Sequence, residues 1–157
     1  MAEVHDRSKR QEVKIAKDLG GKRQPASGSR WGYKRDVISE KFLVEAKSTI
    51  RKSYRLVLKD LEFLRQQAHA KSKEPIYIVD MAGTSIVLGT LEALYPCVMS
   101  GTISSHLSES ALTYPMEADM LSANKRVANV FDCVGFKYCG EWYVFVSYDE
   151  FLEVAND

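Results

Sequence analysis

The feature that most constrains the fold is the segment Phe42–Lys47 (FLVEAK), in which an acidic and a basic residue lie inside a hydrophobic run. If the segment is a β-strand, successive side chains point to opposite faces. The even-numbered side chains are then all apolar and belong in the core, whereas Leu43, Glu45 and Lys47 share the other face. A carboxylate in such a run is costly without a partner or a metal ion. We therefore expect a neighbouring group that accommodates Glu45.

A second acidic residue lies just before this segment. Asp36 begins a short expected strand, and a tight turn at about residues 39–41 joins it to the strand Lys41–Ser48. The turn brings Asp36 back alongside Val44 or Glu45, at a cross-strand distance of roughly 4.5–5.5 Å. Two carboxylates at such a short distance repel each other. A divalent cation such as Mg²⁺, which prefers carboxylate oxygens, removes the repulsion.

Lys47 is then close enough to the two acids to steer a water molecule or to stabilise charge on a phosphate. The alternative is a solvated ion pair of Glu45 and Lys47 on an exposed strand, the usual arrangement for an acid and a lysine two residues apart. Two features favour the metal site. The basic segment 24–35 lies directly before Asp36, and the helix expected before that segment carries a further acid, Glu12.

The order of the other expected elements is typical of an α/β protein. Helical or alternating apolar spacing predicts a helix at 8–19 that ends at Gly20-Gly21, strands at 22–24, 36–38 and 41–48, a helix at 53–70, a strand at 76–81, and near the C-terminus a strand at 141–147 and a helix at 149–154 capped by Ser147 or Asp149. This αβββαβ order predicts one domain with a central mixed sheet flanked by helices. Residues 83–137 fit the order poorly, so we expect an added region there, either a capping subdomain or a dimer surface.

The charges along the chain are segregated. The 157 residues suffice for one domain with a hydrophobic core, and the 45% hydrophobic and 27% charged residues are ordinary for a soluble globular protein. Residues 1–73 hold 19 Lys and Arg against 9 Asp and Glu, whereas residues 74–157 hold 3 against 12. Such segregation indicates a face that binds a polyanion, although solvated helix faces are an alternative source of it.

Cysteine, histidine and hydropathy patterns argue against several other classes. The three cysteines form no C-x-x-C pair, which is typical of free thiols in a reducing cytosol. The three histidines are scattered, so a histidine-ligated metal site is not expected. Residues 1–20 are polar and carry both charges, and the longest apolar stretch, residues 86–99, is too short to span a bilayer. We therefore expect a cytoplasmic protein with no membrane association.

With these residues in order, the sequence resembles the PD-(D/E)XK nuclease superfamily, and within it the archaeal-type and phage Holliday junction resolvases. The matching positions are Glu12, Gly20-Gly21, Ser27-Gly28-Ser29, Asp36 and Glu45-Ala46-Lys47. The resemblance covers residues 7–82 and returns weakly at 141–154. The chain departs from the pattern at residues 83–137, and Arg35 stands where many members have a proline before the first acid. The resemblance implies a restriction-endonuclease-like core.

The resemblance also implies a role for each matching residue. Asp36 and Glu45 would bind Mg²⁺, with the carbonyl of Ala46 as a further ligand, and Mn²⁺ is expected to substitute. Glu12 would bind a second metal ion or its water shell. Lys47 would orient and help to activate the attacking water.

Contacts to DNA are expected from the first helix and the basic segment. Ser27 or Ser29 would contact the region of the scissile phosphate, with Ser29 counted among the catalytic residues. Trp31 and Tyr33 would either stack on bases or be buried under the segment. The candidates for phosphate contacts are Arg7, Lys9, Arg10, Lys14, Lys22, Arg23, Arg30, Lys34 and Arg35.

The expected function is therefore a structure-selective endonuclease that resolves four-way DNA junctions, as a two-fold homodimer, by metal-dependent phosphodiester hydrolysis. One alternative is a restriction, repair or homing nuclease with the same fold, since fold does not fix substrate. The alternative from another class is a DNA-binding protein without catalytic activity. The four positions Glu12, Asp36, Glu45 and Lys47 keep chemically competent residues, which favours an enzyme.

Overall fold

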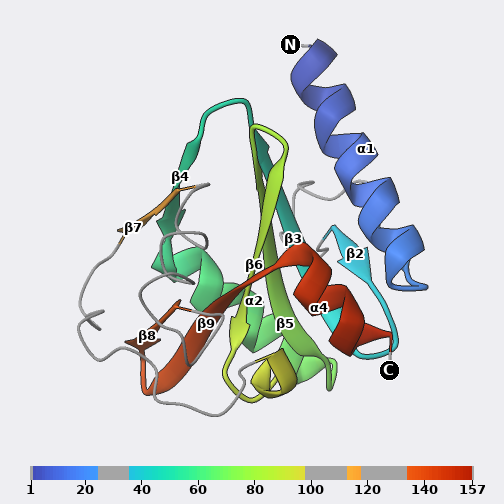
Figure 1. Cartoon of the computed structure of the whole chain (residues 1–157). Coiled ribbons are helices and arrows are strands. Elements are labelled where there is room, and N and C mark those ends of the chain that lie inside the picture. Colours follow the sequence, from blue (N-terminus) through green and yellow to red (C-terminus); the bar gives the residue numbers. More distant parts are fainter. Residues whose placement is uncertain (1, 25–35, 98–112, 118–133, 157) are drawn as a thin grey trace.

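The computed structural model describes residues 2–24, 36–97, 113–117 and 134–156 (Figure 1). The elements are α1 (Ala2–Asp18), β1 (Lys22–Arg23), β2 (Val37–Ile38), β3 (Phe42–Thr49), β4 (Ser53–Val57), α2 (Leu58–Ala70), β5 (Glu74–Met81), β6 (Thr84–Thr90), the 3₁₀ helix η1 (Tyr95–Cys97), β7 (Thr113–Glu117), β8 (Val134–Tyr138), β9 (Glu141–Ser147) and α4 (Tyr148–Ala155). In these residues no helix is both long and apolar enough to cross a lipid bilayer.

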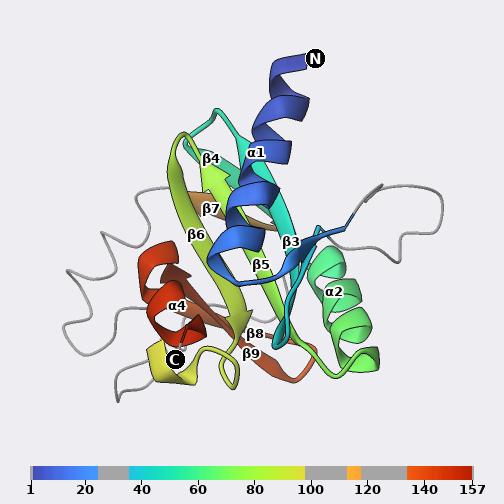
Figure 2. The ribbon, with the colours of Figure 1, turned by 90° about the vertical axis from the view of Figure 1, so that its right-hand side faces the viewer.

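Seven strands form the central sheet, in the order β1-β2-β3-β5-β6-β9-β8. The pair β3 and β5 is parallel and all its other neighbours are antiparallel, so the sheet is mixed as expected. Helix α2 packs on one face, while α1 and α4 pack on the other (Figure 2). The expectation of a mixed sheet flanked by helices is therefore confirmed. Strands β4 and β7 form a separate two-stranded sheet.

Strand β3 separates the two cores as its sequence predicts. Leu43 is fully buried in the cluster that includes the apolar face of α2. Val44 and Ala46 point the other way, into the cluster that includes Ile15 of α1 and Phe151 of α4. The period of two in this segment thus places Glu45 and Lys47 on the α2 side of the sheet.

Helix α1 ends where the sequence predicts and begins earlier. Gly20 has a φ of 63°, and the N–H of Gly21 donates to the carbonyl of Ala16 at 2.8 Å, which closes the helix. A Cβ on Gly21 would collide with the carbonyl oxygen of Ile38, so a glycine is needed where β1 approaches β2. The helix starts at Ala2, not at residue 8, and Val13, expected in the apolar stripe, is 51% exposed.

The sequence-based expectations were wrong at two boundaries. Residues 53–57 form strand β4, and α2 begins at Leu58, so four strands lie between α1 and α2 where αβββαβ has three. Within β4 the partly buried Tyr54 and the buried Leu56 alternate with exposed residues, as in a strand, and helical spacing begins only at Val57. β4 pairs with the distant β7. The added region was expected at 83–137, but β6 and β8 at its two ends belong to the central sheet. Residues 98–112 and 118–133 lie outside the described part of the chain.

The C-terminal strand and helix agree with the sequence. The hydroxyl of Ser147 accepts a hydrogen bond from the N–H of Glu150 at 3.2 Å, so Ser147, and not Asp149, caps α4. Among the described residues Cys97 and Cys139 are in no disulfide, and the buried thiol of Cys97 donates to the carbonyl of Glu150 at 3.7 Å. Cys133 lies outside the described residues.

A hydrogen bond from Tyr148 to the carboxylate of Asp18 joins the start of α4 to the end of α1. The carboxylate of Asp18 accepts hydrogen bonds from Lys14 and from the hydroxyl of Tyr148, both at 2.7 Å. Burial alone would raise the pKa of Asp18, but these two partners outweigh it and lower the pKa from 3.8. A carboxyl group with a lowered folded-state pKa stabilises the fold above its unfolded pKa and loses that effect as the pH falls.

Asp18→Asn should therefore lower the melting temperature at pH 7, and its difference from wild type should shrink as the pH falls through and below 3.8. Thermal unfolding followed by circular dichroism at a series of pH values measures this difference. Asp6→Asn, an exposed change on the same helix, is the control. A difference that stays constant over the whole pH range would contradict the assignment.

Candidate active site

Asp36 joins β2 to β3 through both its backbone and its side chain. Its N–H donates to the carbonyl of Val44 at 3.0 Å, and its Oδ2 accepts the N–H of Ala46 at 2.7 Å. The side chain thus continues the hydrogen bonding of the strand pair beyond the end of the short β2. Asp36 is 7% exposed, and this contact fixes the orientation of its carboxylate against β3.

The backbone of β3 presents a carbonyl oxygen beside this carboxylate. The carbonyls of Phe42 and Val44 accept from Ser39 and Asp36, so the even-numbered residues of β3 direct their backbone groups toward β2. In an extended strand the N–H and C=O of one residue point to the same side. The carbonyl of Ala46 therefore faces the same sheet edge as the Asp36 carboxylate that its N–H contacts.

Glu45 and Lys47 form an ion pair on the α2 side of β3. Their Oε1 and Nζ atoms are 3.3 Å apart, and the side chains are 12% and 41% exposed, respectively. Burial alone would lower the pKa of Lys47, but the negative charge of Glu45, with a smaller contribution from Asp36, raises it. With its pKa raised, Lys47 is protonated at neutral pH.

Two tyrosines that the sequence alone did not single out complete this part of the site. Tyr77 of β5 lies directly beside Glu45 in the parallel register and is fully buried. Its hydroxyl is 2.9 Å from that of Tyr54 on β4. Burial and the hydrogen bond to Tyr54 raise the pKa of Tyr77 far above its usual value. The sequence places Tyr77 in an expected strand and Tyr54 in a segment expected to be helical. Their contact depends on a strand register that local spacing does not reveal.

Glu12 of α1 contacts the short strand β1. It is 8% exposed on α1, and its Oε2 accepts from the Nε of Arg23 at 2.6 Å. The neighbouring Gln11 donates to the carbonyl of Lys47 at 2.8 Å, which ties α1 to β3. In the described part of the chain, no group of three or more His, Cys, Asp or Glu residues is arranged to hold a metal ion. Glu12 as a metal ligand beside Asp36 and Glu45 therefore stays a prediction.

The expected DNA contacts are partly described. Lys9, Arg10 and Lys14 are exposed on α1, Arg7 is partly exposed there, and Lys22 is exposed and Arg23 partly buried on β1. The other candidates lie outside the described residues: Ser27, Ser29, Arg30, Trp31, Tyr33, Lys34 and Arg35.

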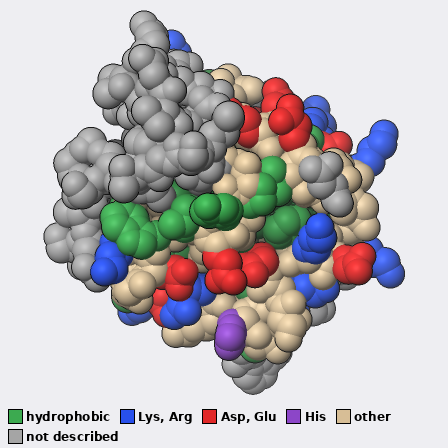
Figure 3. Space-filling view, turned by 60° about the horizontal axis from the view of Figure 1, so that its bottom comes forward, with side chains coloured by type: hydrophobic (Ala, Val, Ile, Leu, Met, Phe, Trp, Pro, Cys, Tyr) green, Lys and Arg blue, Asp and Glu red, His purple; other side chains and the backbone are tan. Residues whose placement is uncertain are grey.

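The face at the bottom of Figure 1 intermixes acidic and basic side chains around exposed hydrophobic ones (Figure 3). Segregation of charge along the sequence thus does not give that face a charge of one sign.

The residues around Asp36 fit a magnesium ion. Mg²⁺ binds oxygen ligands and is commonly held by one or two carboxylates together with water. The carboxylates of Asp36 and Glu45 and the carbonyl of Ala46 supply oxygens, and the Ala46 N–H holds the Asp36 carboxylate in place. Two carboxylates and a carbonyl would therefore suffice without Glu12.

No family model matches the chain, and no curated protein matches it. Among solved structures, the chain is similar to Hjc, a Holliday junction resolvase from the archaeal hyperthermophile Archaeoglobus fulgidus. The TM-score is 0.44 and the sequence identity is 15%, over 54% of this chain and 76% of that chain. At this TM-score and identity the likeness carries no functional conclusion for this chain, whose chemistry depends on its own residues.

The tyrosine pair gives a prediction about stability. Tyr54→Phe leaves the buried hydroxyl of Tyr77 without this partner and should lower the free energy of unfolding by about 1–2 kcal/mol. The double variant Tyr54→Phe/Tyr77→Phe should lower the free energy of unfolding by less than the sum of the two single changes. Removing both hydroxyls leaves neither of them without a hydrogen-bond partner. Urea unfolding measures all three values, with Tyr95→Phe, which is 66% exposed in wild type, as the control. Strict additivity would mean that the two hydroxyls are not coupled.

Proposed function

We propose that this protein is a magnesium-dependent endonuclease that hydrolyses DNA phosphodiester bonds at the edge formed by β2 and β3. The observation that carries the proposal is the 2.7 Å hydrogen bond from the Ala46 N–H to Asp36, which holds one acid against the strand that bears Glu45 and Lys47. This arrangement fits the order of acid, acid and lysine in the nuclease superfamily that the sequence resembles.

Each residue has a distinct part in the proposed reaction. Asp36, Glu45 and the Ala46 carbonyl would hold Mg²⁺, which supplies charge stabilisation at the phosphate and lowers the pKa of water. Lys47, kept protonated beside Glu45, would orient the attacking water and offset negative charge on the phosphate. The hydrolysis needs no covalent enzyme intermediate.

We further propose a four-way DNA junction as the substrate and a homodimer as the active form. A junction offers two equivalent strands to cut, and a two-fold dimer presents two equivalent sites. The support for this finer assignment is the motif order from Glu12 to Lys47 together with that symmetry.

The rival assignment within the same class is a restriction, repair or homing nuclease. Incubating the protein with Mg²⁺ and either a four-way junction or a linear duplex of the same arm sequence separates the two. Preferential cutting of the junction, in symmetrically placed strands, supports resolution. Equal or preferential cutting of the linear duplex supports the rival.

Substitutions at the acids test the proposed chemistry. Asp36→Asn and Glu45→Gln should each bind DNA and cut it roughly 100-fold or more slowly, because each removes a ligand of an ion that contributes several kcal/mol. Glu153→Gln, which removes an exposed carboxylate of α4, should cut at the wild-type rate. Single-turnover cleavage of a labelled junction in Mg²⁺ measures the rates, and gel mobility in Ca²⁺ measures binding.

A different result would favour the alternative from another class. If wild type binds the junction but cuts no DNA in either Mg²⁺ or Mn²⁺, the protein is a DNA-binding protein without this activity. If Asp36→Asn cuts as fast as wild type, hydrolysis takes place elsewhere and the proposed site is wrong.

A further inference from the structure

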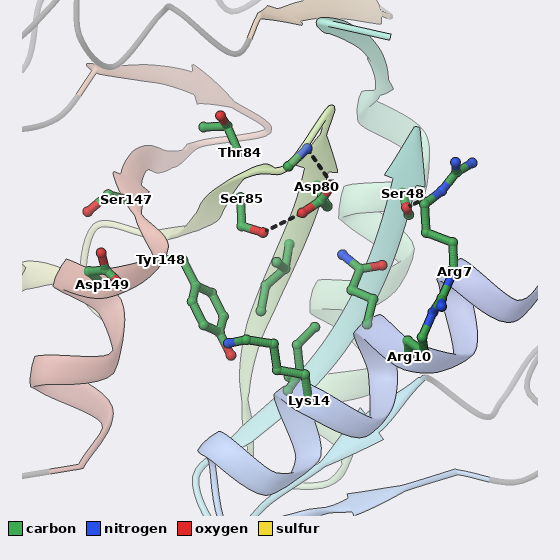
Figure 4. A pocket seen from close by; sticks show the side chains of 14 residues that line it. Arg7, Arg10, Lys14, Ser48, Asp80, Thr84, Ser85, Ser147, Tyr148 and Asp149 are labelled. Carbon is green, nitrogen blue, oxygen red and sulfur yellow. Dashed lines mark hydrogen bonds between the residues drawn. The ribbon is translucent and has the colours of Figure 1, made fainter. Parts of the chain in front are cut away.

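A cavity of about 570 Å³ lies between α1 and the start of α4, over the carboxyl ends of the parallel strands β3 and β5 (Figure 4). Ser48 of β3 and Ile78 and Asp80 of β5 line its sheet side. Open α/β sheets commonly bind ligands beyond the carboxyl ends of parallel strands. A volume of this size falls within the range of small-ligand sites.

The wall contributed by α1 is cationic. Arg7, Arg10 and Lys14 follow one another at spacings of three and four residues and therefore share one side of the helix. The Nε of Arg7 donates to the hydroxyl of Ser48 at 2.9 Å, which orients its guanidinium and leaves its other N–H groups available. Lys14 is engaged by Asp18 at 2.7 Å and lies over the ring of Tyr148.

Arg10 is the second available cation of this wall. It is exposed, and within the described residues no hydrogen bond or ion pair of its guanidinium is found. In Figure 4 the side chains of Arg7 and Arg10 come from neighbouring turns of α1 on the same side of the cavity. Guanidinium groups on one side of a cavity supply the N–H donors that phosphate oxygens accept.

Two carboxylates line the sheet side and the α4 side of the cavity. Asp80 accepts hydrogen bonds from the N–H of Gly83 and the hydroxyl of Ser85, both at 3.1 Å, and Asp149 lies in the first turn of α4. The carboxylate of Asp149 disfavours an anionic group at the α4 end of the cavity, which leaves the side of α1. The cavity thus suits a ligand with a phosphate at one end and a polar, uncharged part at the other, such as one nucleotide unit of a DNA strand.

This cavity is separated from the candidate active site by β3 itself. Lys47 and Ser48 are successive residues of the strand, so their side chains point to opposite faces of the sheet. Glu45 and Lys47 lie on the α2 side, whereas Ser48 lines the cavity on the side of α1. A phosphate in the cavity would therefore be a different one from the phosphate that is cut.

We propose that this cavity is a second nucleotide-binding site, in which Arg7 and Arg10 together bind one backbone phosphate of the DNA, away from the bond that is hydrolysed. The inference rests on the proposed function for the identity of its ligand, DNA. Gln11, which lines the cavity, also donates to the carbonyl of Lys47, so the two sites share one helix–strand contact.

The experiment measures junction binding in Ca²⁺ over a series of salt concentrations for wild type, Arg10→Gln, Arg7→Gln and Arg7→Gln/Arg10→Gln. The slope of log K against log salt counts the phosphates that are neutralised. Each single change should weaken binding, and the double change should reduce the slope by about one, which corresponds to roughly tenfold weaker binding at 0.1 M salt. Lys71→Gln, which removes one exposed cation just after α2, should leave the slope unchanged.

The outcomes separate this inference from the proposed function. A slope reduced by about two in the double variant would mean two separate phosphates and would overturn the shared site. If the double variant has the same slope as Lys71→Gln and the wild type cuts DNA, the cavity site is wrong and the nuclease proposal stands. A slope reduced by about one, in a protein that cuts no DNA, would support the cavity site while the hydrolytic proposal fails.

Discussion

The candidate site depends on the hydrogen bond between the Asp36 carboxylate and the backbone N–H of Ala46. Strand β2 has two residues and cannot by itself hold a long stretch of β3 in register. The Asp36 side chain supplies the next bond of the ladder, so the residue expected to bind the metal ion also secures the edge of the sheet. Such a double role leaves the acid little freedom to rotate, and a fixed carboxylate is what a magnesium site with few protein ligands requires.

The parts of the fold that follow from local spacing were predictable from the sequence. The alternation in Phe42–Lys47 placed each side chain on its correct face, and Gly20 and Ser147 marked a helix end and a helix start. The parts that depend on distant pairing were not. β4 directly precedes the helical apolar spacing of α2, yet it is a strand that pairs with the distant β7. β6 lies in the central sheet because its partners are β5 and β9.

The same distinction applies to the site. The turn between Asp36 and β3 is local, so the approach of Asp36 to the Glu45–Lys47 strand could be inferred, and the structure agrees. The position of Glu12 depends on how α1 packs against β1, and there Arg23 takes its carboxylate. Tyr77 lies beside Glu45 because β3 and β5 pair in parallel, with α2 in the segment that connects them. No short stretch of sequence encodes the register of such a pair.

The small sheet has a consequence for how the chain reaches its folded state. Val57 at the end of β4 pairs with Thr113 of β7, so this contact closes a long loop of chain. Loop closure carries an entropic cost that grows with loop length, whereas β2 and β3 meet across a short turn. We therefore expect the β2–β3 hairpin to form early and the β4–β7 pair late, with Tyr54 reaching its place beside Tyr77 after the sheet edge that carries Asp36 is assembled.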